Sequence, residues 1–296
     1  MDISAYLKEN KRRVDSFLDT YFSAPMHPAV LHQSVVYSLS AGGKRIRPVL
    51  CIASHEACGG VVEDALPFAA ALELIHTYSL IHDDLPAMDN DDLRRGKPTN
   101  HKVYGEGMAI LAGDALLTEA FCLLSDASMA GTGVSSEARV KVVHEIAFAA
   151  GGRGMVGGQA QDLLSEDAEP DAETLSFIHR HKTAALIAAS VRAGGMLASC
   201  DEAALRGLTE YGETVGLAFQ IIDDILDVEG DTEVLGKQRG SDEKKKKMTY
   251  PRLYGLDASK REARKLMDRA EHALETFDRG ADRLREIARF VIERRS

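Results

Sequence analysis

The stretch LRGLTEYGETVGLAFQIIDDILDV, residues 205–228, decides the fold class of this chain. Its apolar residues recur at three- and four-residue spacing, which predicts an α-helix. Ala, Gly, Ile and Leu lie nearly all round that helix, and its polar residues are few. A helix that is apolar on most of its surface is typical of the core of a large bundle. We therefore expect an all-α protein.

The same spacing extends over most of the chain, and convincing period-two strands are absent. Further helices are predicted over residues 65–81, 140–150, 175–193 and 258–277. Loop formers gather at residues 40–43, 59–60, 96–98, 131–136, 165–171 and 230–241. None of these breaks has the composition of an interdomain linker, and no repeat of fixed period occurs. The sequence thus predicts one all-α domain over residues 1–296, a single bundle of about ten or more helices.

Composition limits the class of protein and its partners. The 296 residues are 45% hydrophobic with a formal net charge of −10, which is typical of a globular protein and argues against nucleic-acid binding, since no basic face appears. The N-terminus lacks the features of a signal peptide, and no uninterrupted apolar run of about 18 residues predicts a membrane span. The four cysteines form no C-x-x-C pair, so we expect free thiols in a reducing cytoplasm rather than a zinc site.

Two acidic clusters stand far apart in the sequence, DDLPAMD at residues 83–89 and DDILD at residues 223–227. Clustered carboxylates that face one another repel unless a divalent cation lies between them, and Mg²⁺ typically bridges carboxylates and substrate phosphates. Cationic residues follow both clusters, at Arg94, Arg95, Lys237 and residues 244–247. This combination favours a site for a metal-bound diphosphate.

Helix geometry separates the roles within each cluster. Asp223 and Asp227 are four residues apart and share one helix face, with Asp224 rotated by about 100°. Asp83 and Asp89 would lie about 120° apart on an ideal helix. Pro86 between them disfavours a regular helix, so we expect the helix to end or bulge there and Asp89 to return toward Asp83.

Two other interpretations of the clusters stay open at this point. Most Asp-Asp pairs serve as helix N-caps or as solvated acidic turns. His82 and Asp83 could instead form the dyad of a metal phosphohydrolase, a class that needs further histidine ligands, for which only His76 is well placed in the sequence.

The sequences around both clusters resemble the two aspartate-rich motifs of the trans-isoprenyl diphosphate synthases. These segments are LIHDDLPAMDNDDLRRG at residues 80–96 and FQIIDDILD at residues 219–227. Other segments stand in the family's order, namely GGKRIRP at 42–48, GQAQD at 158–162, KT at 182–183 and KMTYP at 247–251. The resemblance therefore covers nearly the whole chain. Asn90 departs from it, because many close relatives have another aspartate there.

This resemblance implies a reaction, a fold and a cofactor. The fold would be isoprenoid synthase-like, with the helices around a central cavity. The reaction would be the head-to-tail condensation of isopentenyl diphosphate with an allylic diphosphate. Mg²⁺, as three ions with substrate bound, and nearby lysines would neutralise the diphosphate so that its C–O bond ionises to an allylic cation. The family also implies a homodimer.

Site residues follow from the resemblance position by position. The metal ligands would be Asp83, Asp89 and Asp223, with Asp84 and Asp227 as supporting carboxylates. The allylic diphosphate would be bound by Arg94, Lys182, Lys237 and Lys247, and Thr183 and Gln220 would offer neutral oxygens near the cation. The isopentenyl diphosphate pocket needs direct cationic donors and would consist of Lys44, Arg47, His76 and Arg95. The catalytic set would be Asp83, Asp84, Asp89, Lys182, Thr183, Gln220, Asp223 and Lys237.

Several of these residues also have a structural interpretation. A histidine on an apolar helix, such as His76, is often a hydrogen-bonded core residue. The basic run at 244–247 is typical of a solvated surface, and we assign a function only to Lys247, which would close over the substrate. The guanidinium groups of Arg94 and Arg95 could pair with Asp91 and Asp92.

Two residues before the first cluster bear on product length. Tyr78 and Ser79 lie five and four residues before Asp83, about one turn of helix away, where a growing prenyl chain would pass. An aromatic ring there would act as a floor of the cavity, which blocks further growth of the chain. An aromatic residue at this position, together with the two-residue insertion in the first motif, resembles the pattern of the bacterial farnesyl diphosphate synthases. We therefore expect a C15 product made by way of geranyl diphosphate. Synthesis of geranyl or geranylgeranyl diphosphate is the alternative.

Two rival functions remain. A class I terpene cyclase would share the fold and the first motif, but the second Asp-Asp-x-x-Asp and the GGKRIRP segment argue against it. A non-catalytic partner subunit of a prenyl synthase would be expected to have lost aspartates or diphosphate-binding lysines. This chain retains them.

Overall fold

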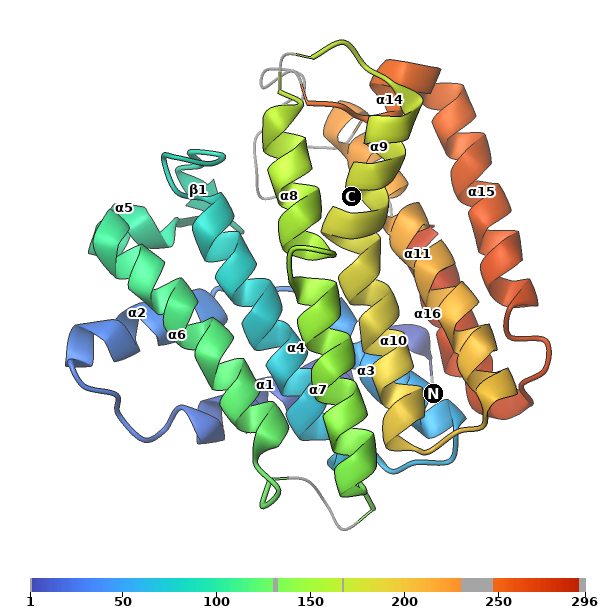
Figure 1. Ribbon diagram of the computed structural model, residues 1–296, viewed down its shortest axis with the longest axis horizontal. Coiled ribbons are helices and arrows are strands. Elements are labelled where there is room, and N and C mark those ends of the chain that lie inside the picture. Colours follow the sequence, from blue (N-terminus) through green and yellow to red (C-terminus); the bar gives the residue numbers. More distant parts are fainter. Residues whose placement is uncertain (1, 130–132, 167, 230–246, 293–296) are drawn as a thin grey trace.

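The computed structural model describes residues 2–129, 133–166, 168–229 and 247–292 and shows the expected all-α class (Figure 1). The N-terminal part contains α1 (Ile3–Tyr21), α2 (Ala29–Leu39), α3 (Ile46–Ala57), α4 (Val62–Asp83), α5 (Asn100–Tyr104) and α6 (Glu106–Ser125). The middle contains α7 (Ser136–Ala150), α8 (Met155–Leu164), α9 (Ala172–Ile178), α10 (Ala185–Leu197) and α11 (Glu202–Glu229). The C-terminal part contains α14 (Tyr250–Tyr254), α15 (Leu256–His272), the 3-10 turn η2 (Arg279–Ala281) and α16 (Asp282–Ile292).

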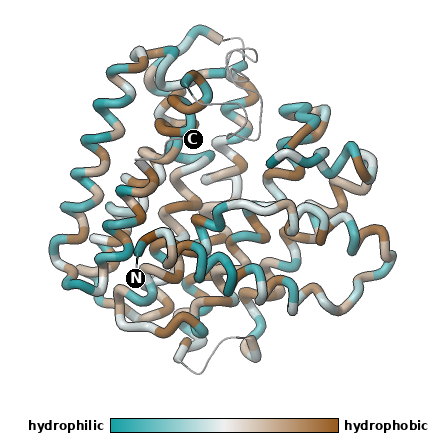
Figure 2. Tube along the Cα trace, turned by 180° about the vertical axis from the view of Figure 1, so that it is seen from behind, coloured by the Kyte–Doolittle hydropathy of each residue, from teal (hydrophilic) through white to brown (hydrophobic). Residues whose placement is uncertain are grey.

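Burial explains why α4 and α11 occupy the middle of the bundle. Phe68 and Leu72 of α4 are fully buried, and α4 packs against α3 and α6. Tyr211 of α11 is also fully buried, and α11 packs against α10 and α15. The outer helix α15 is mostly hydrophilic in Figure 2, as expected for a helix with one face in water.

The helix predicted over residues 175–193 has an irregular turn inside it. Residues His179–Ala184 form a turn of π-helix, η1, between α9 and α10. Such turns are uncommon and frequently lie at functional sites. Here η1 carries Lys182 and Thr183, two of the predicted site residues.

One element was not expected, and one predicted helix end was wrong. The chain has a short antiparallel hairpin, β1 (Leu93–Arg94) and β2 (Lys97–Pro98), which is too short to produce a period-two pattern. Its turn is made by Arg95 and Gly96, both with positive φ (54° and 76°). The helix predicted over residues 258–277 ends at His272, and the chain turns through Leu274 and Phe277.

Among the described residues, one helix is long and apolar enough to cross a membrane by length and composition alone. This helix is α6, and 39% of its most apolar window is buried inside the protein. Asp114 and Glu119 interrupt its apolar sequence, and it packs along α4. A single such helix is weak evidence for a membrane span, because bundle cores contain helices of the same kind.

The ends of α4 and α11 determine where the predicted site lies. Toward the upper end of the bundle in Figure 1, α4 ends beside β1, and α11 ends near α14. The two acidic clusters are therefore brought to the same end of the molecule, although they are distant in the sequence. The predicted break at residues 230–241 lies outside the described residues.

Candidate active site

The chain reverses direction directly after α4. The helix ends at Asp83, where Pro86 is too near for the helix to continue regularly. The backbone N–H of Asp89 donates to the carbonyl oxygen of Asp83 at 2.8 Å, and Asn90 adopts a left-handed conformation with a φ of 52°. These contacts bring Asp89 back beside Asp83, so the predicted interruption of the helix is confirmed.

The environment of Asp83 is unfavourable for a negative charge. Burial raises the pKa of the Asp83 carboxyl to about 6, and the neighbouring Asp89 adds to the rise. Lys182, Arg94 and Lys247 oppose it, which shows that cationic groups from three segments surround this carboxyl. A further cation would be stabilised here.

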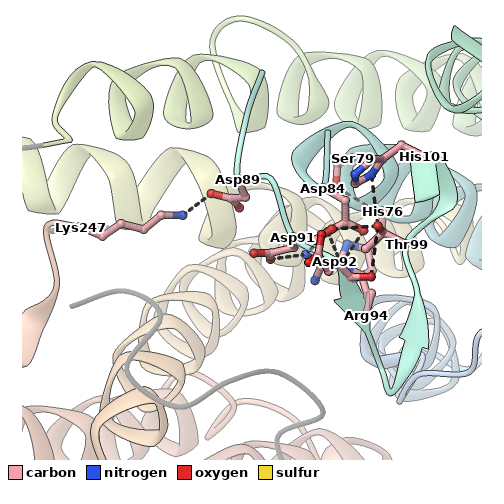
Figure 3. A network of polar contacts seen from close by, with 10 residues as sticks. All are labelled: His76, Ser79, Asp84, Asp89, Asp91, Asp92, Arg94, Thr99, His101 and Lys247. Atoms are coloured by element: carbon pink, nitrogen blue, oxygen red, sulfur yellow. Dashed lines mark hydrogen bonds and ion pairs between the residues drawn. The ribbon is translucent and has the colours of Figure 1, made fainter. Parts of the chain in front are cut away.

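Two lysines from distant segments meet at the acidic residues. The Nζ of Lys247 lies 2.7 Å from Oδ1 of Asp89 (Figure 3) and 3.7 Å from Oδ2 of Asp162. The Nζ of Lys182 lies 2.6 Å from the same oxygen of Asp162. Gly158 permits this arrangement, because a Cβ at that position would lie only 2.1 Å from the backbone nitrogen of Lys182. The close approach of α8 to η1 thus depends on a glycine.

Arg94 binds the second carboxylate of the first cluster. Its Nε lies 2.7 and 2.9 Å from the two oxygens of buried Asp84, and its Nη2 lies 3.5 Å from Asp91 (Figure 3). Asp92 instead pairs with Lys102 at 2.7 Å. The pairing of Arg94 with Asp91, suggested as a structural role, is therefore present. Arg94 also pairs with Asp84, and Asp92 is not its partner.

The second cluster contains a carboxylate that organises its surroundings. Buried Asp224 accepts a hydrogen bond from Nε2 of Gln220 and another from the backbone N–H of Tyr250, both at 2.8 Å. Nε2 of buried His179 lies 3.2 Å from the same carboxylate. The hydroxyl of Thr183 donates to Oε1 of Gln220 at 2.6 Å. Asp224 therefore links α11 to η1 and to the start of α14.

The other two aspartates of α11 lie on a different face from Asp224. Asp223 is half-buried and Asp227 is buried, and their four-residue spacing places them one turn apart. Lys237, predicted to bind the allylic diphosphate, lies outside the described residues.

The residues predicted for isopentenyl diphosphate gather around His76. Burial, together with the positive charges of Arg47 and Arg95, holds the pKa of the His76 imidazole well below its usual value, so this side chain is neutral near pH 7. Arg95 donates to the carbonyl oxygen of Gly42, and a Cβ on Gly43 would overlap its guanidinium group. Lys44 is exposed on the same segment. This group is rich in cationic donors, as a pocket for an anion requires.

The predicted chain-length residues occupy the last turns of α4. The ring of Tyr78 is 6% exposed, and burial raises its pKa to about 12. It packs edge-on against the imidazole of His82 at 5.8 Å between ring centres. Nε2 of His82 lies 3.1 Å from the carbonyl oxygen of Ile110 in α6, so the alternative His82–Asp83 metal dyad gains no support. The hydroxyl of Ser79 donates to the carbonyl oxygen of His76, in the same helix, at 2.9 Å.

The donor set of this site suits a hard divalent cation. In the described part of the chain, no three carboxylate, imidazole or thiolate groups form a closed metal site. Asp83, Asp89, Asp162 and Asp223 nevertheless supply oxygen donors at one end of the bundle, and Mg²⁺ is bound by few carboxylates together with substrate phosphates. Burial, with the nearby charge of Asp89, raises the pKa of Asp83, so a cation bound at this carboxyl would favour its ionised form. These residues fit Mg²⁺.

Comparison with known proteins identifies the family. The model of the polyprenyl synthetase family matches residues 28–284. The chain belongs to this family. It is 45% identical to a farnesyl diphosphate synthase of Geobacillus stearothermophilus (99% of this chain, 98% of the other) and 48% identical to a geranylgeranyl diphosphate synthase of Cyanophora paradoxa (99% and 97%). A solved FPP/GFPP synthase of Zymomonas mobilis superposes with a TM-score of 0.87 at 36% identity, covering 98% of each chain.

Membership in the polyprenyl synthetase family confirms the resemblance found in the sequence and makes the chain a prenyltransferase of the trans-isoprenyl diphosphate synthase type. The structure adds residues that sequence reasoning did not assign to the site. These are Asp162, which binds Lys182, and the pair His179 and Tyr250, which contact Asp224. A signal was present for Asp162, which ends the GQAQD segment, but the partners of Asp224 depend on helix packing.

Proposed function

We propose that this polyprenyl synthetase condenses isopentenyl diphosphate with dimethylallyl diphosphate, and then with geranyl diphosphate, to give (2E,6E)-farnesyl diphosphate. The observation that carries the proposal is the return of Asp89 to Asp83, with Lys247 bound to Asp89 and Lys182 bound to the neighbouring Asp162. Acidic and cationic groups in one place suit a diphosphate that enters with a divalent cation.

Mg²⁺ bound by Asp83, Asp89 and Asp223 would neutralise the diphosphate leaving group of the allylic substrate. Lys182 and Lys247 would then release their carboxylate partners and donate to the diphosphate oxygens. Asp84 and Asp227 would support this site by adding negative charge near the ligands rather than by binding substrate.

The chain's own residues would orient the reaction. The allylic C–O bond breaks and its electrons leave with the diphosphate; the double bond of isopentenyl diphosphate then attacks the cation, and loss of one proton restores an alkene. Thr183 and Gln220, held to each other at 2.6 Å, would present oxygen dipoles that stabilise the cation. Lys44, Arg47, His76 and Arg95 would hold the second diphosphate without a metal.

The proposed product length depends on Tyr78. Its ring is buried one turn before Asp83, which supports a floor at that depth. Relatives of nearly equal similarity are named farnesyl and geranylgeranyl diphosphate synthases, so a C20 product is the second candidate. We further propose a single catalytic unit over residues 1–296, a cytoplasmic enzyme and a homodimer. Exposed apolar side chains on α6 and α7, such as Leu111 and Val140, support the homodimer.

The test is an incubation of the purified protein with Mg²⁺, labelled isopentenyl diphosphate and dimethylallyl diphosphate, followed by dephosphorylation and chromatography of the alcohols. Mainly farnesol is the expected result. Geranylgeraniol would keep the reaction and reject the role of Tyr78. The absence of any Mg²⁺-dependent product would favour a terpene cyclase or a non-catalytic partner subunit instead.

A further inference from the structure

A cavity of about 560 Å³ lies beside η1, on a different face from Lys182 and Thr183. Its walls come from α7, η1, α10, α11 and α15. Of these, α7, α10 and α11 run side by side in Figure 1. None of the residues predicted for the reaction lines it. Its volume is in the range of small-molecule sites.

Four arginines from different segments line this cavity, namely Arg153, Arg180, Arg192 and Arg269. Two of them are neutralised by carboxylates. Nε of Arg192 lies 2.6 Å from Glu145, and Nε of Arg269 lies 2.9 Å from Glu210. These ion pairs fix the two guanidinium groups as parts of the wall.

The other two arginines have no carboxylate within ion-pair distance in the described part of the chain. The guanidinium carbon of Arg153 lies 5.9 Å from the ring centre of Phe148, and Arg180 donates to the hydroxyl of Ser176 at 3.2 Å. With Arg192 and Arg269 neutralised by Glu145 and Glu210, Arg153 and Arg180 remain in the lining against one further acidic residue, Glu213. A positive cavity is unexpected in a chain whose net charge is −10, and it favours an anionic ligand.

Apart from His181, Thr209 and Thr214, the rest of the lining is apolar. It consists chiefly of Phe148, Ala184, Ala185, Ala188, Leu217 and Leu266. A free inorganic anion would leave this surface in contact with water. A ligand with a charged head and a short apolar chain would use both parts of the cavity.

We propose that this cavity binds a phosphate or diphosphate ester with a short apolar chain. Its phosphate oxygens pair with the guanidinium groups of Arg153 and Arg180, which suit phosphate because they donate in a planar fork. Its chain lies against Ala188 and Leu217. The site is separate from the proposed reaction centre, so the proposal does not depend on the reaction.

Occupancy of this cavity acts on the active site through η1. Arg180 lies within η1, two residues before Lys182, and a π-helical turn packs less regularly than an α-helix. A ligand held by Arg180 therefore biases the position of Lys182, which binds Asp162 at 2.6 Å. By linkage, substrate binding and ligand binding influence each other.

Calorimetric titration with octyl phosphate in the presence of EDTA tests the binding, without turnover. The wild-type protein is compared with the double variant Arg153→Ala/Arg180→Ala and with Arg206→Ala, an exposed arginine of α11 that does not line the cavity. We expect a single site whose affinity falls by about tenfold for each arginine lost. Arg206→Ala should bind as the wild type does. Far-UV circular dichroism checks the fold, and each single arginine variant is measured as well.

Three results would overturn the proposal. Octyl phosphate fails to bind, or it binds equally well to the double variant, or inorganic phosphate binds as tightly as the ester, which would leave the apolar lining unused. Coupling to the active site is measured by turnover at saturating substrate. Octyl phosphate should change kcat in the wild type and leave kcat of the double variant unchanged. An equal effect on both proteins would refute the coupling through η1.

Discussion

Replacing Arg45 by methionine is expected to destabilise the protein and to weaken its binding of isopentenyl diphosphate. The Arg45 side chain is 4% exposed and binds Glu73, which is 1% exposed, at 2.6 Å. It also donates to Asp15 at 2.8 Å and to the carbonyl oxygen of Leu39 at 2.7 Å. The backbone at Arg45 is left-handed, with a φ of 51°, so these contacts hold a conformation that a non-glycine residue avoids.

The magnitude follows from burial. Removing one partner of a buried ion pair costs about 3–5 kcal/mol, because the other charge stays buried without compensation. Asp15 is 30% exposed, so the loss of its contact adds less than about 1 kcal/mol. The total loss is about 3–6 kcal/mol, and at roughly 2 °C per kcal/mol for a chain of this size the melting temperature should fall by about 6–12 °C.

Two variants separate the ion pair from other effects. In Arg45→Met/Glu73→Leu the buried charge is gone from both sides, and most of the lost stability should return. Arg12→Met removes an arginine that pairs with Glu9 on the surface and should change the melting temperature very little. Thermal unfolding followed by circular dichroism measures all three. A double variant as unstable as Arg45→Met would refute the reasoning.

The same substitution has a kinetic consequence. Arg45 stands between Lys44 and Arg47, two residues predicted to bind isopentenyl diphosphate. Loss of the left-handed turn should raise KM for isopentenyl diphosphate about tenfold, the effect of roughly one lost charge-assisted contact, and leave KM for dimethylallyl diphosphate nearly unchanged. An equal rise in KM for both substrates would mean that the segment from Lys44 to Arg47 does not act specifically on isopentenyl diphosphate.

Four further substitutions test individual residues. Asp83→Ala should abolish turnover without lowering the melting temperature, because burial already raises the pKa of this carboxyl to about 6; a folded variant with wild-type rates would contradict its assignment. Tyr78→Ala should shift the alcohol products from C15 toward C20, and unchanged products would place the floor elsewhere. Burial, followed by nearby guanidinium groups, lowers the pKa of His76, so below pH 6.5 only the unfolded chain gains this proton. Stability should therefore rise with pH up to about 6.5, by at most about 1.4 kcal/mol per unit, and His76→Gln should reduce that slope in urea unfolding. Gly158→Ala would place a Cβ 2.1 Å from the backbone nitrogen of Lys182 and should lower both kcat and the melting temperature; an unaffected enzyme would exclude this close packing.

Periodicity located the helices well, because burial imposes a repeat that the sequence must carry. The long helix predicted over residues 205–228 is α11, from Glu202 to Glu229. Periodicity did not reveal the π-turn at His179–Ala184, since its apolar residues still fit a helical pattern. The hairpin at Leu93–Pro98 was also missed, because two-residue strands leave no alternation to detect.

The site was predictable where chemistry is local in the sequence. Pro86 and the six-residue spacing of Asp83 and Asp89 were sufficient to predict the return of the chain after α4. Contacts between helices were not predictable in the same way. That Asp224 meets His179 depends on how α11 packs against η1, and no spacing within either segment encodes it.

The position of the acidic residues at the helix ends has an energetic cost. Asp83 ends α4, and Asp223 and Asp227 lie in the last turns of α11, where the helix dipole already contributes negative charge. Helices are more stable with cations at such ends. Carboxylates at both C-termini therefore oppose folding, and the nearby positive charges of Lys182 and Lys247 offset part of that cost at Asp83. An arrangement that is unfavourable for the helices but favourable for a cation and its diphosphate is expected where selection acts on function rather than on stability.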